Sequence, residues 1–349
     1  MLRDFMQRLL QAAGCPNESA GIAADAFLEA DLRGIGLQGL DHLPSMIREL
    51  RLGHIDPAGM PRIAKDGPAY LLIDGQRGPG QVAAVFATDL AIRKARSAGV
   101  CCAGIVNSAD IFMIGFYAER IARAGHIGLV FSDAPPLVHP FGGVERVLGT
   151  NPLALAFPTE DDHPALIDMA TSAMSASRVR QAAYFDEPLP EGVGVDGAGQ
   201  PSTHAADVRR GAIGPLAGHK GFALGLAVAL LSGPLVGAQV VSALKGFLDA
   251  ASGPAGSKGH LLLAIDPACF GDPQEFRAAV SAYLKEIRSS RKAAGVSEIR
   301  VPGERVFAER ERSLREGVRI YDVVWENAAR LAADLGVAIP ELRSPALGP

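Results

Sequence analysis

The spacing of apolar residues predicts helices at the start of the chain and a mixture of strands and helices in its middle. Between residues 4 and 50, apolar side chains such as Phe5, Leu9 and Phe27 recur at helical spacing. From about residue 69 the pattern changes to short apolar runs that are typical of strands. These runs are AYLLIDG, GVCCAGIVNS, HIGLVFSDA, PLALAFPT and PALIDMATS, with helical stretches at 80–98 and 114–124 between the early ones. The alternation predicts an α/β core.

The second half of the chain begins with a segment of different composition. Residues 186–218 are rich in Gly, Pro, Asp and Ala, which indicates a long exposed excursion. The elements expected after it are helices at 219–232, 237–250, 273–294, 304–317 and 321–335, and a strand at 259–267. Because the strands after Pro158 follow one another through loops, a purely parallel sheet is not expected.

The most apolar window, residues 221–238, has about the minimum length of a membrane span. Three glycines and Pro234 interrupt it, so we expect a buried helix and no membrane contact. The net charge of -4 comes without a block of five like charges, and we therefore expect no nucleic-acid partner. The four cysteines form no CxxC pair, which argues against a zinc site and favours reduced thiols in the cytoplasm. We expect no bound metal.

Common catalytic and nucleotide-binding motifs are weak in this sequence or missing from it. Gly75, Gly78 and Gly80 are spaced GxxGxG, whereas a Rossmann fingerprint is GxGxxG. This segment is equally well interpreted as a glycine-rich turn that opens a helix. The sequence contains no P-loop, no GxSxG and no HExxH motif, so triphosphate hydrolysis, serine hydrolysis and zincin chemistry lose their usual support.

Four other segments together predict an anionic ligand. Thr150 and Asn151 supply short hydrogen-bonding side chains where a strand begins. Asp168 closes a strand ahead of small and hydroxyl residues that allow a ligand to approach the backbone. The pair His219 and Lys220 opens a helix, where free amides and a cation suit a phosphate, and VPGERV at 301–306 offers a glycine turn with an arginine.

These segments are where the chain resembles a known family. The motifs DLRGIGLQGLDHLPSMI, GTNPLALAFPT, IDMATS, GHKGFALGL and IRVPGER match the malate/L-lactate dehydrogenase family of NAD(P)-dependent oxidoreductases, in the family's order. That family includes ureidoglycolate, sulfolactate and diketogulonate enzymes and cyclic ketimine reductases. The resemblance extends from the first helices to about residue 335.

The resemblance implies a fold and a subunit arrangement. The expected fold is α/β, a non-Rossmann nucleotide-binding fold on a mostly antiparallel mixed sheet with helical terminal segments. The implied domains are a helical segment 1–65 packing with 318–349, and a nucleotide-binding domain 66–317 with an inserted helical subdomain at about 186–255. A homodimer is also implied.

The resemblance further implies a dinucleotide, NAD or NADP, bound by three segments. The implied contacts are Asp168, Met169, Ala170, Thr171, Ser172, Ala173 and Met174, then His219 and Lys220, and then Gly303, Glu304 and Arg305. Arg178 is a further candidate for a phosphate contact, with a surface salt bridge as the competing interpretation. Leu37, Thr150 and Asn151 are the candidate contacts for a small-molecule substrate.

The sequence departs from the family where the substrate chemistry takes place. Family members usually carry Ser-His-Gly where this chain has Leu37, Gln38 and Gly39, and that histidine donates a proton to the substrate oxygen. His42 replaces an arginine that often binds the substrate carboxylate, and Asp110 replaces a further histidine. The cofactor motifs are therefore retained, while the proton donor is lost.

Three hypotheses remain open for this altered site. A cyclic imine can be protonated before it binds, so Gln38 could serve as a hydrogen-bond partner and Asp110 could pair with the iminium charge. Alternatively, His42 could act as the substitute acid of a 2-hydroxy acid dehydrogenase, with an ordinary pKa near 6.5, unless it is only a surface histidine at a helix start. A third hypothesis is a catalytically impaired, cofactor-binding protein that serves as a binding or scaffolding subunit.

Overall fold

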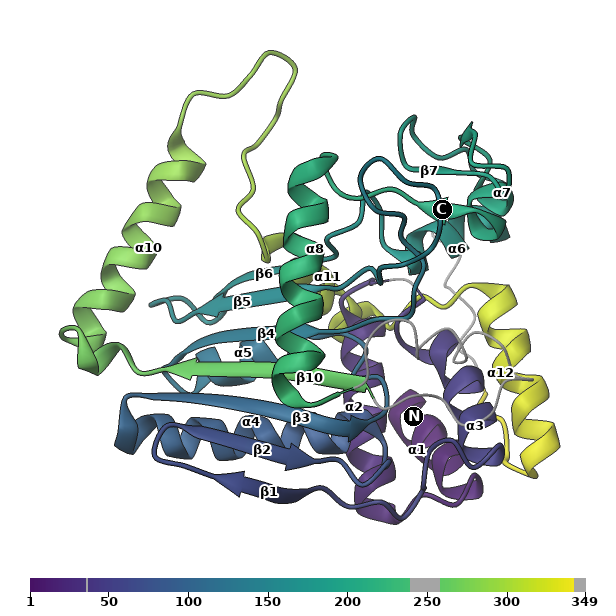
Figure 1. The fold of residues 1–349 in the computed structure, drawn as a ribbon, viewed down its shortest axis with the longest axis horizontal. Helices are drawn as coiled ribbons and strands as arrows, with labels where there is room; N and C mark the ends of the chain where they lie inside the picture. Colours follow the sequence, from purple (N-terminus) through teal and green to yellow (C-terminus); the bar gives the residue numbers. More distant parts are fainter. Residues whose placement is uncertain (36, 239–257, 342–349) are drawn as a thin grey trace.

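The computed structural model describes residues 1–35, 37–238 and 258–341. Its centre is a seven-stranded sheet with the order β1-β2-β3-β10-β4-β5-β6 (Figure 1). The strands are β1 (Arg62–Asp66), β2 (Tyr70–Asp74), β3 (Val100–Ser108), β4 (Ile127–Ser132), β5 (Leu153–Phe157), β6 (Ala165–Met169) and β10 (Lys258–Ile265). Only β2 and β3 pair in parallel, and the other neighbours are antiparallel. The expected mostly antiparallel mixed sheet is confirmed.

Two helices cover one face of the sheet and form the main core with it. They are α4 (Gly80–Ala98) and α5 (Gly115–Arg123) (Figure 1). Small residues of α4, among them Ala84, Ala87 and Ala91, are fully buried, and they allow the helix to lie close to the strands. The glycine-rich stretch at 75–80 is the turn that opens α4, as one of the two interpretations proposed.

A second core joins the two ends of the chain. Helices α1 (Leu2–Ala12), α2 (Asn17–Leu32) and α3 (Leu43–Arg51) pack with α12 (Asp322–Leu335) (Figure 1). Phe5, Leu9 and Phe27, which showed helical spacing in the sequence, are buried there together with Val324 and Ala328. The division of the chain into domains stays a prediction.

The stretch DEPLPEGVGVDGAGQPST, residues 186–203, is largely exposed as expected, but residues 186–218 have more regular structure than their composition suggested. They contain a three-stranded sheet, with the order β8-β7-β9, and a short helix. The elements are β7 (Gly194–Val195), β8 (Pro201–Ser202), α7 (Ala205–Arg210) and β9 (Ala212–Ile213). Leu189, Val193 and Val208 are buried against α6 (Ala176–Tyr184) in a small core of their own. The described part of the expected helical insertion at 186–255 is thus a mixture of strands and helices.

Helix α8 (His219–Ser232) lies on the other face of the main sheet and is followed by η2 (Pro234–Val236). It is less buried than expected, because Leu224, Leu226 and Leu230 are exposed. Among the described residues, one helical stretch, His219–Val236, is long enough and apolar enough to span a membrane. Of this stretch, 39% is buried inside the protein. The helix expected at 237–250 falls outside the described residues, apart from its first two positions.

The last elements are η4 (Pro267–Cys269), α10 (Pro273–Ser289) and α11 (Glu304–Glu316). Helix α10 projects from the body of the molecule in Figure 1, and none of its residues is buried. By contrast, α11 packs against α2 through a buried ionic network and Phe307. Helix α11 begins at the turn around Gly303, whose φ of 97° is a conformation that glycine adopts without strain.

Candidate active site

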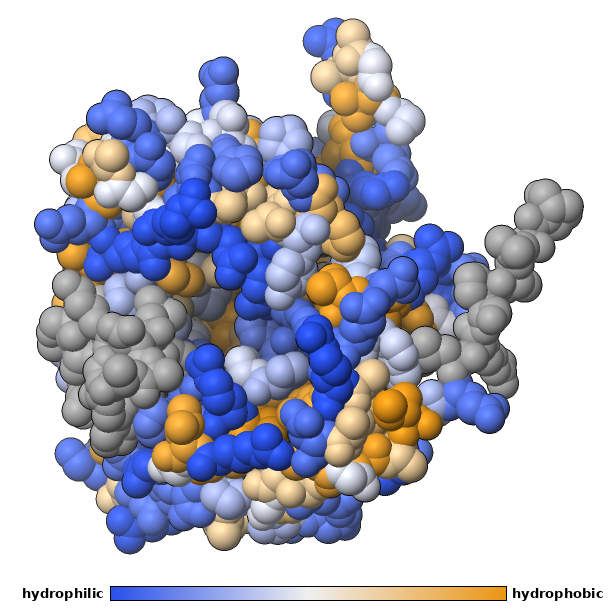
Figure 2. Space-filling model, turned by 90° about the vertical axis from the view of Figure 1, so that its right-hand side faces the viewer, coloured by the Kyte–Doolittle hydropathy of each residue, from blue (hydrophilic) through white to orange (hydrophobic). Residues whose placement is uncertain are grey.

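A cavity of about 1040 Å³ lies between the helical second core and the carboxyl end of β6. Figure 2 shows the hollow, with largely hydrophilic residues around its rim. Its lining residues fall in the ranges 33–55, 109–114, 132–137, 150–152, 166–180 and 300–306, together with positions 81 and 216. Distant parts of the sequence therefore meet in one site, at the upper end of the size range of ligand pockets.

The turn at residues 37–42 forms one wall of this cavity. Leu37 has a φ of 65°, and the chain then enters the short helix η1 (Leu40–His42). The buried carboxylate of Asp31 accepts a hydrogen bond from the Leu40 amide at 2.9 Å. Gly39 is needed because a Cβ there would come within 2.1 Å of the Asp31 side chain.

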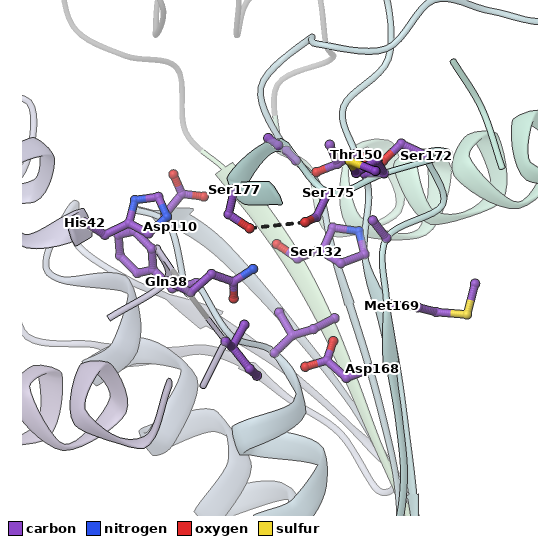
Figure 3. A pocket seen from close by; sticks show the side chains of 18 of the residues that line it. Gln38, His42, Asp110, Ser132, Thr150, Asp168, Met169, Ser172, Ser175 and Ser177 are labelled. Carbon is purple, nitrogen blue, oxygen red and sulfur yellow. Dashed lines mark hydrogen bonds between the residues drawn. The ribbon is translucent and has the colours of Figure 1, made fainter. Parts of the chain in front are cut away.

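The structure separates the two residues at the centre of this turn. Gln38 lines the cavity, and its carboxamide points toward the open space in Figure 3. Leu37 instead places its side chain in the helical core, outside the cavity lining. Its carbonyl oxygen accepts a hydrogen bond from Arg180 Nη2 at 2.7 Å. Leu37 was a candidate substrate contact, and its side chain is not brought to the site.

His42 lies at the cavity wall, so its interpretation as a surface histidine is wrong. Its ring packs on Phe112 with 4.9 Å between centroids, and Arg180 Nη2 lies 3.4 Å from His42 Nε2. The surrounding protein, and then the nearby Arg180 charge, lower the pKa of His42 to about 3. The expected ordinary pKa near 6.5 is therefore also wrong, and the imidazole is neutral at physiological pH.

Asp110 forms an ion pair that the sequence did not predict. Its Oδ1 contacts the ammonium group of Lys258, whose side chain is only 1% exposed. Asp133 lies close enough for Lys258 to lower its pKa, but burial dominates and raises the pKa of Asp133 to about 6. Two carboxylates thus face one ammonium, and the group carries one net negative charge when both carboxyls are ionised. Asp110 and Asp133 line the cavity.

Buried His260 supports this group from β10. Its Nδ1 lies 2.8 Å from Ser132 Oγ, and its Nε2 lies 3.1 Å from the Ala109 carbonyl oxygen. Since a carbonyl only accepts, Nε2 carries the proton and Nδ1 accepts from the serine hydroxyl. Burial lowers the pKa of His260 to about 4, so this histidine is also neutral.

Asp168 lies on the opposite side of the cavity from His42 and Asp110 (Figure 3). Part of its surface faces the hollow, while protein surrounds it, and this burial raises the pKa of its carboxyl to about 6. Asp168 Oδ2 accepts a hydrogen bond from the Gly115 amide at 3.0 Å, at the start of α5.

The segment after Asp168 follows the cavity for most of its length. Five of its residues line the cavity: Met169, Ala170, Ser172, Ala173 and Met174. All five are among the residues that the family resemblance implied as contacts of a dinucleotide. Thr171 is buried instead, and its hydroxyl donates to the carbonyl oxygens of Thr150 and Asn151 at 3.1 Å.

Among the two polar candidates at 150–151, only Thr150 lines the cavity. Asn151 is fully buried, and its side chain forms hydrogen bonds within the protein. Its Oδ1 accepts from the Ala134 amide at 3.2 Å, and its Nδ2 donates to the Gly225 carbonyl at 2.9 Å. Asn151 thus ties α8 to the cavity wall and does not reach a ligand.

The other predicted cofactor contacts divide into two groups. Gly303 and Arg305 line the cavity, whereas Glu304 accepts a hydrogen bond from the Val301 amide at 2.9 Å and shapes the turn. His219 and Lys220 are exposed at the start of α8 and are not among the lining residues. Arg178 forms an exposed salt bridge with Glu187 at 3.0 Å, as the competing interpretation proposed.

Sequence reasoning missed Arg180, which lines the cavity, and Lys258, which pairs with the lining residue Asp110. Each lies more than 100 positions from its partner in the turn or in NSADIFMIG, and neither belongs to a recognisable motif. The one available signal for Lys258 was its place directly before a predicted apolar strand. Within the described ranges, no cluster of three or more His, Cys, Asp or Glu side chains is arranged to hold a metal ion.

The fold and cavity define a non-Rossmann α/β protein with a large cavity between its sheet and a helical region. Residues 1–328 match the family model described as malate/L-lactate dehydrogenase, and the chain belongs to this family. It is therefore an oxidoreductase, and dehydrogenases of this family use NAD or NADP. The family predicted from the sequence motifs is confirmed.

Individual relatives cover almost the whole chain. The chain is 34% identical over 337 residues to malate/(S)-sulfolactate dehydrogenase of Methanothermus fervidus, a match covering 97% of each sequence. It resembles the solved malate dehydrogenase from Pyrococcus horikoshii OT3 with a TM-score of 0.88 and 35% identity, over 97% and 94% of the two chains. It also resembles delta1-piperideine-2-carboxylate reductase from Pseudomonas syringae with a TM-score of 0.85 and 30% identity, over 95% and 98%.

Proposed function

We propose that this oxidoreductase reduces the C=N bond of a small cyclic imine carboxylate with NADH or NADPH. The observation that carries the proposal is that the turn at residues 37–42 carries no cationic acid and lies beside a negatively charged group. Gln38 cannot exchange a proton near neutral pH, and His42, with its pKa of about 3, is already neutral. His42 is therefore not supported as the substitute for the missing acid.

An imine substrate removes the need for that acid. A ring imine is more basic than a ketone and can bind as the iminium cation, so its carbon is electrophilic before hydride arrives. The Asp110, Asp133 and Lys258 group, with its net negative charge, attracts such a cation by on the order of 1 to 4 kcal/mol at contact distance. Gln38 accepts or donates a hydrogen bond at the same wall. A ketone gains nothing comparable from this group.

The residues present suit a dinucleotide. The cavity extends from Gln38 past the 168–174 segment to the glycine turn at Gly303, and Arg305 supplies a cation at that end. NADH or NADPH, when bound, supplies a hydride. The small residues Ala170, Ser172 and Ala173 let a ligand lie against the backbone. The lining residues do not discriminate NAD from NADP.

A second candidate function is a 2-hydroxy acid dehydrogenase in which Asp133 delivers the proton. Asp133 lines the cavity, and its pKa of about 6 allows it to hold a proton near neutral pH. The similarity to malate/(S)-sulfolactate dehydrogenase of Methanothermus fervidus also favours this candidate.

The first experiment measures cofactor binding and then compares substrates. Calorimetry of the wild-type protein with NADH and with NADPH should show binding of at least one, and binding of neither would favour the catalytically impaired, scaffolding alternative. The kcat/KM values for Δ1-piperideine-2-carboxylate and pyruvate follow. We expect the imine to be preferred by on the order of 10²-fold or more, the usual contribution of a positioned acid.

Three variants separate the candidates. Leu37→Ser, Gln38→His and His42→Arg combined restore the family's residues and should raise pyruvate turnover. Robust wild-type pyruvate turnover that His42→Ala abolishes would reject the imine proposal and make His42 the acid. Pyruvate turnover lost in Asp133→Asn and kept in His42→Ala would establish the second candidate.

We also propose that two copies form the functional unit in the cytoplasm. The exposed apolar face of α8 and the projecting, unburied α10 support a partner of the same chain, because neither surface is covered within the described part of one protomer. The free thiols of Cys15, Cys101, Cys102 and Cys269 support a reducing compartment.

A further inference from the structure

Arg180 connects helix α6 to the altered turn at 37–42. Its Nη2 group donates to the Leu37 carbonyl at 2.7 Å and lies 2.6 Å from Asp41 Oδ2. The Asp41 side chain is only 6% exposed, so it is a fixed partner. These contacts hold the guanidinium plane at the cavity wall, beside Gln38 and His42.

The contacts of Arg180 leave donors for a ligand. Its contacts with Leu37, Asp41 and His42 all use Nη2, and the two N–H groups of Nη1 have no partner among residues 1–35, 37–238 and 258–341. The side chain is 24% exposed, and the residue lines the cavity. A planar guanidinium that is held on one side presents its remaining donors in a fixed direction, which suits a carboxylate.

The other arginines of the cavity wall are less suited to this role. Arg33 is buried and paired with Glu29 and Glu119. Arg48 and Arg300 are more than half exposed and paired with neighbouring glutamates. Arg305 lies at the far end, beside the glycine turn at Gly303. Arg180 is thus the arginine with unused donors next to Gln38.

The neutral state of His42 agrees with this arrangement. An arginine only donates hydrogen bonds, so His42 Nε2 faces Arg180 as an acceptor and the ring proton lies on Nδ1. A permanent cation at position 42 would repel the guanidinium group of Arg180. Only one of the two positions 42 and 180 therefore carries a positive charge, and in this chain it is Arg180.

We propose that Arg180 binds the carboxylate of the substrate through Nη1, with Asp41 as its positioning residue. This inference deepens the proposed function and rests on its carboxylate substrate, but not on whether the reduced bond is C=N or C=O. It places the carboxylate on the α6 side of the turn. The iminium nitrogen, bonded to the ring carbon that bears the carboxylate, then faces the net negative charge of the Asp110, Asp133 and Lys258 group, so the two charges of the substrate fix its orientation.

The test compares two imines that differ only in the carboxylate. In Arg180→Ala, kcat/KM for Δ1-piperideine-2-carboxylate should fall on the order of 10²-fold, mainly through KM, while that for Δ1-piperideine should change less than about threefold. Arg180→Lys keeps the positive charge but lacks the paired N–H donors of a guanidinium group, so its loss of kcat/KM for the imine carboxylate should be intermediate. Arg120→Ala, which removes an exposed arginine paired with Asp89, is the control and should change neither value.

A binding measurement keeps the inference separate from the reaction. Calorimetry with pyridine-2-carboxylate, a planar ring carboxylate that cannot be reduced here, should show binding by the wild type and Arg120→Ala and none by Arg180→Ala. The double variant Arg180→Ala/His42→Arg should recover binding. If wild type binds this probe but reduces neither imine, the proposed function fails and the inference stands. Equal binding by the wild type and Arg180→Ala, or no binding by the wild type at millimolar concentration, overturns the inference.

Discussion

At Phe112 the backbone adopts a conformation that few residues other than glycine tolerate. Its φ is 56°, in the left-handed region that favours glycine. The aromatic ring is in turn packed on Phe27 and His42, with 4.9 Å between centroids in both pairs. The left-handed conformation costs roughly 1 to 2 kcal/mol, and the ring contacts offset it.

This strain predicts that the glycine variant at position 112 is more stable than the alanine variant, which is the reverse of the usual order in a helix. Phe112→Gly and Phe112→Ala lose the same ring contacts, but only alanine keeps a Cβ in the left-handed conformation. We expect Phe112→Gly to be more stable than Phe112→Ala by about 1 kcal/mol in urea denaturation. At Phe27, inside helix α2, the order should be the usual one, with alanine above glycine by about 1 kcal/mol. The same order at both sites would contradict the strain at Phe112.

Asp133 gives a pH-dependent prediction. Its folded pKa of about 6 is above the ordinary value of 3.8, so between these values the folded state binds more protons than the unfolded state. The contribution of Asp133 to stability therefore falls as pH rises from about 4 to about 6, and stays low above that.

Replacing Asp133 with asparagine removes this dependence. Relative to wild type, Asp133→Asn should be more stable at pH 8 than at pH 4 by about 1 to 3 kcal/mol, since one pKa unit corresponds to about 1.4 kcal/mol. Urea denaturation at the two pH values measures the difference. If the stability difference between the variant and wild type is the same at both pH values, the pKa of Asp133 is not raised in the folded state.

At the scale of elements, a buried ionic network joins α2, α5 and α11. Arg33 in the turn after α2 lies 3.0 Å from Glu29 and 2.5 Å from Glu119, and Arg310 of α11 lies 2.7 Å from Glu29. The network connects the helical second core to the helices of the sheet domain.

Breaking this network should be far more damaging than breaking a surface pair. Arg33→Ala leaves Glu119 Oε2 buried without its ion-pair partner, while Arg123 still pairs with Oε1, and should destabilise the protein by about 3 to 5 kcal/mol. Arg120→Ala, in the exposed pair with Asp89, should lower stability by less than about 1 kcal/mol. Thermal denaturation of both variants provides the comparison, and similar small losses would mean that the network contributes little.

The elements themselves were largely predictable from the sequence, whereas their arrangement and the site were not. Alternating burial along β4 and β5 matches their apolar runs, because the period of two is a local property. Without the family resemblance, the pattern predicted an α/β core but not the order of its strands, since no local signal places β10 between β3 and β4. The environment of His42 was equally invisible, because Phe112 and Arg180 approach it from distant segments.

At the scale of the whole molecule, two surfaces of the described residues support the proposed dimer. Helix α10 has 17 residues and none is buried, and an isolated helix of this length is only marginally stable in water. Helix α8 exposes Leu224, Leu226 and Leu230 on the face turned away from the sheet. A second copy of the chain would cover both surfaces and stabilise α10.

We therefore expect a dimer in solution and a monomer after charge is placed on α8. Light scattering of the wild type at micromolar concentration should give twice the mass of 36.4 kDa, and Leu230→Glu should shift it toward one protomer. Leu52→Glu, at the end of α3, is the control for a general effect of an exposed leucine replaced by an acid. A monomeric wild type would count directly against the dimer.

The cavity wall also constrains when the protein can acquire a ligand during its synthesis. It joins Arg33, near the beginning of the chain, to Val306, near the end. At roughly 5 to 20 residues per second, a ribosome needs about 15 to 60 s to reach that second segment. Until then the helices of the second core lack α12 and the hollow lacks one wall, so a nascent chain cannot use the dinucleotide as a folding template. In the proposed function, the cofactor therefore binds only after α11 and α12 have been synthesised and have packed against the N-terminal helices.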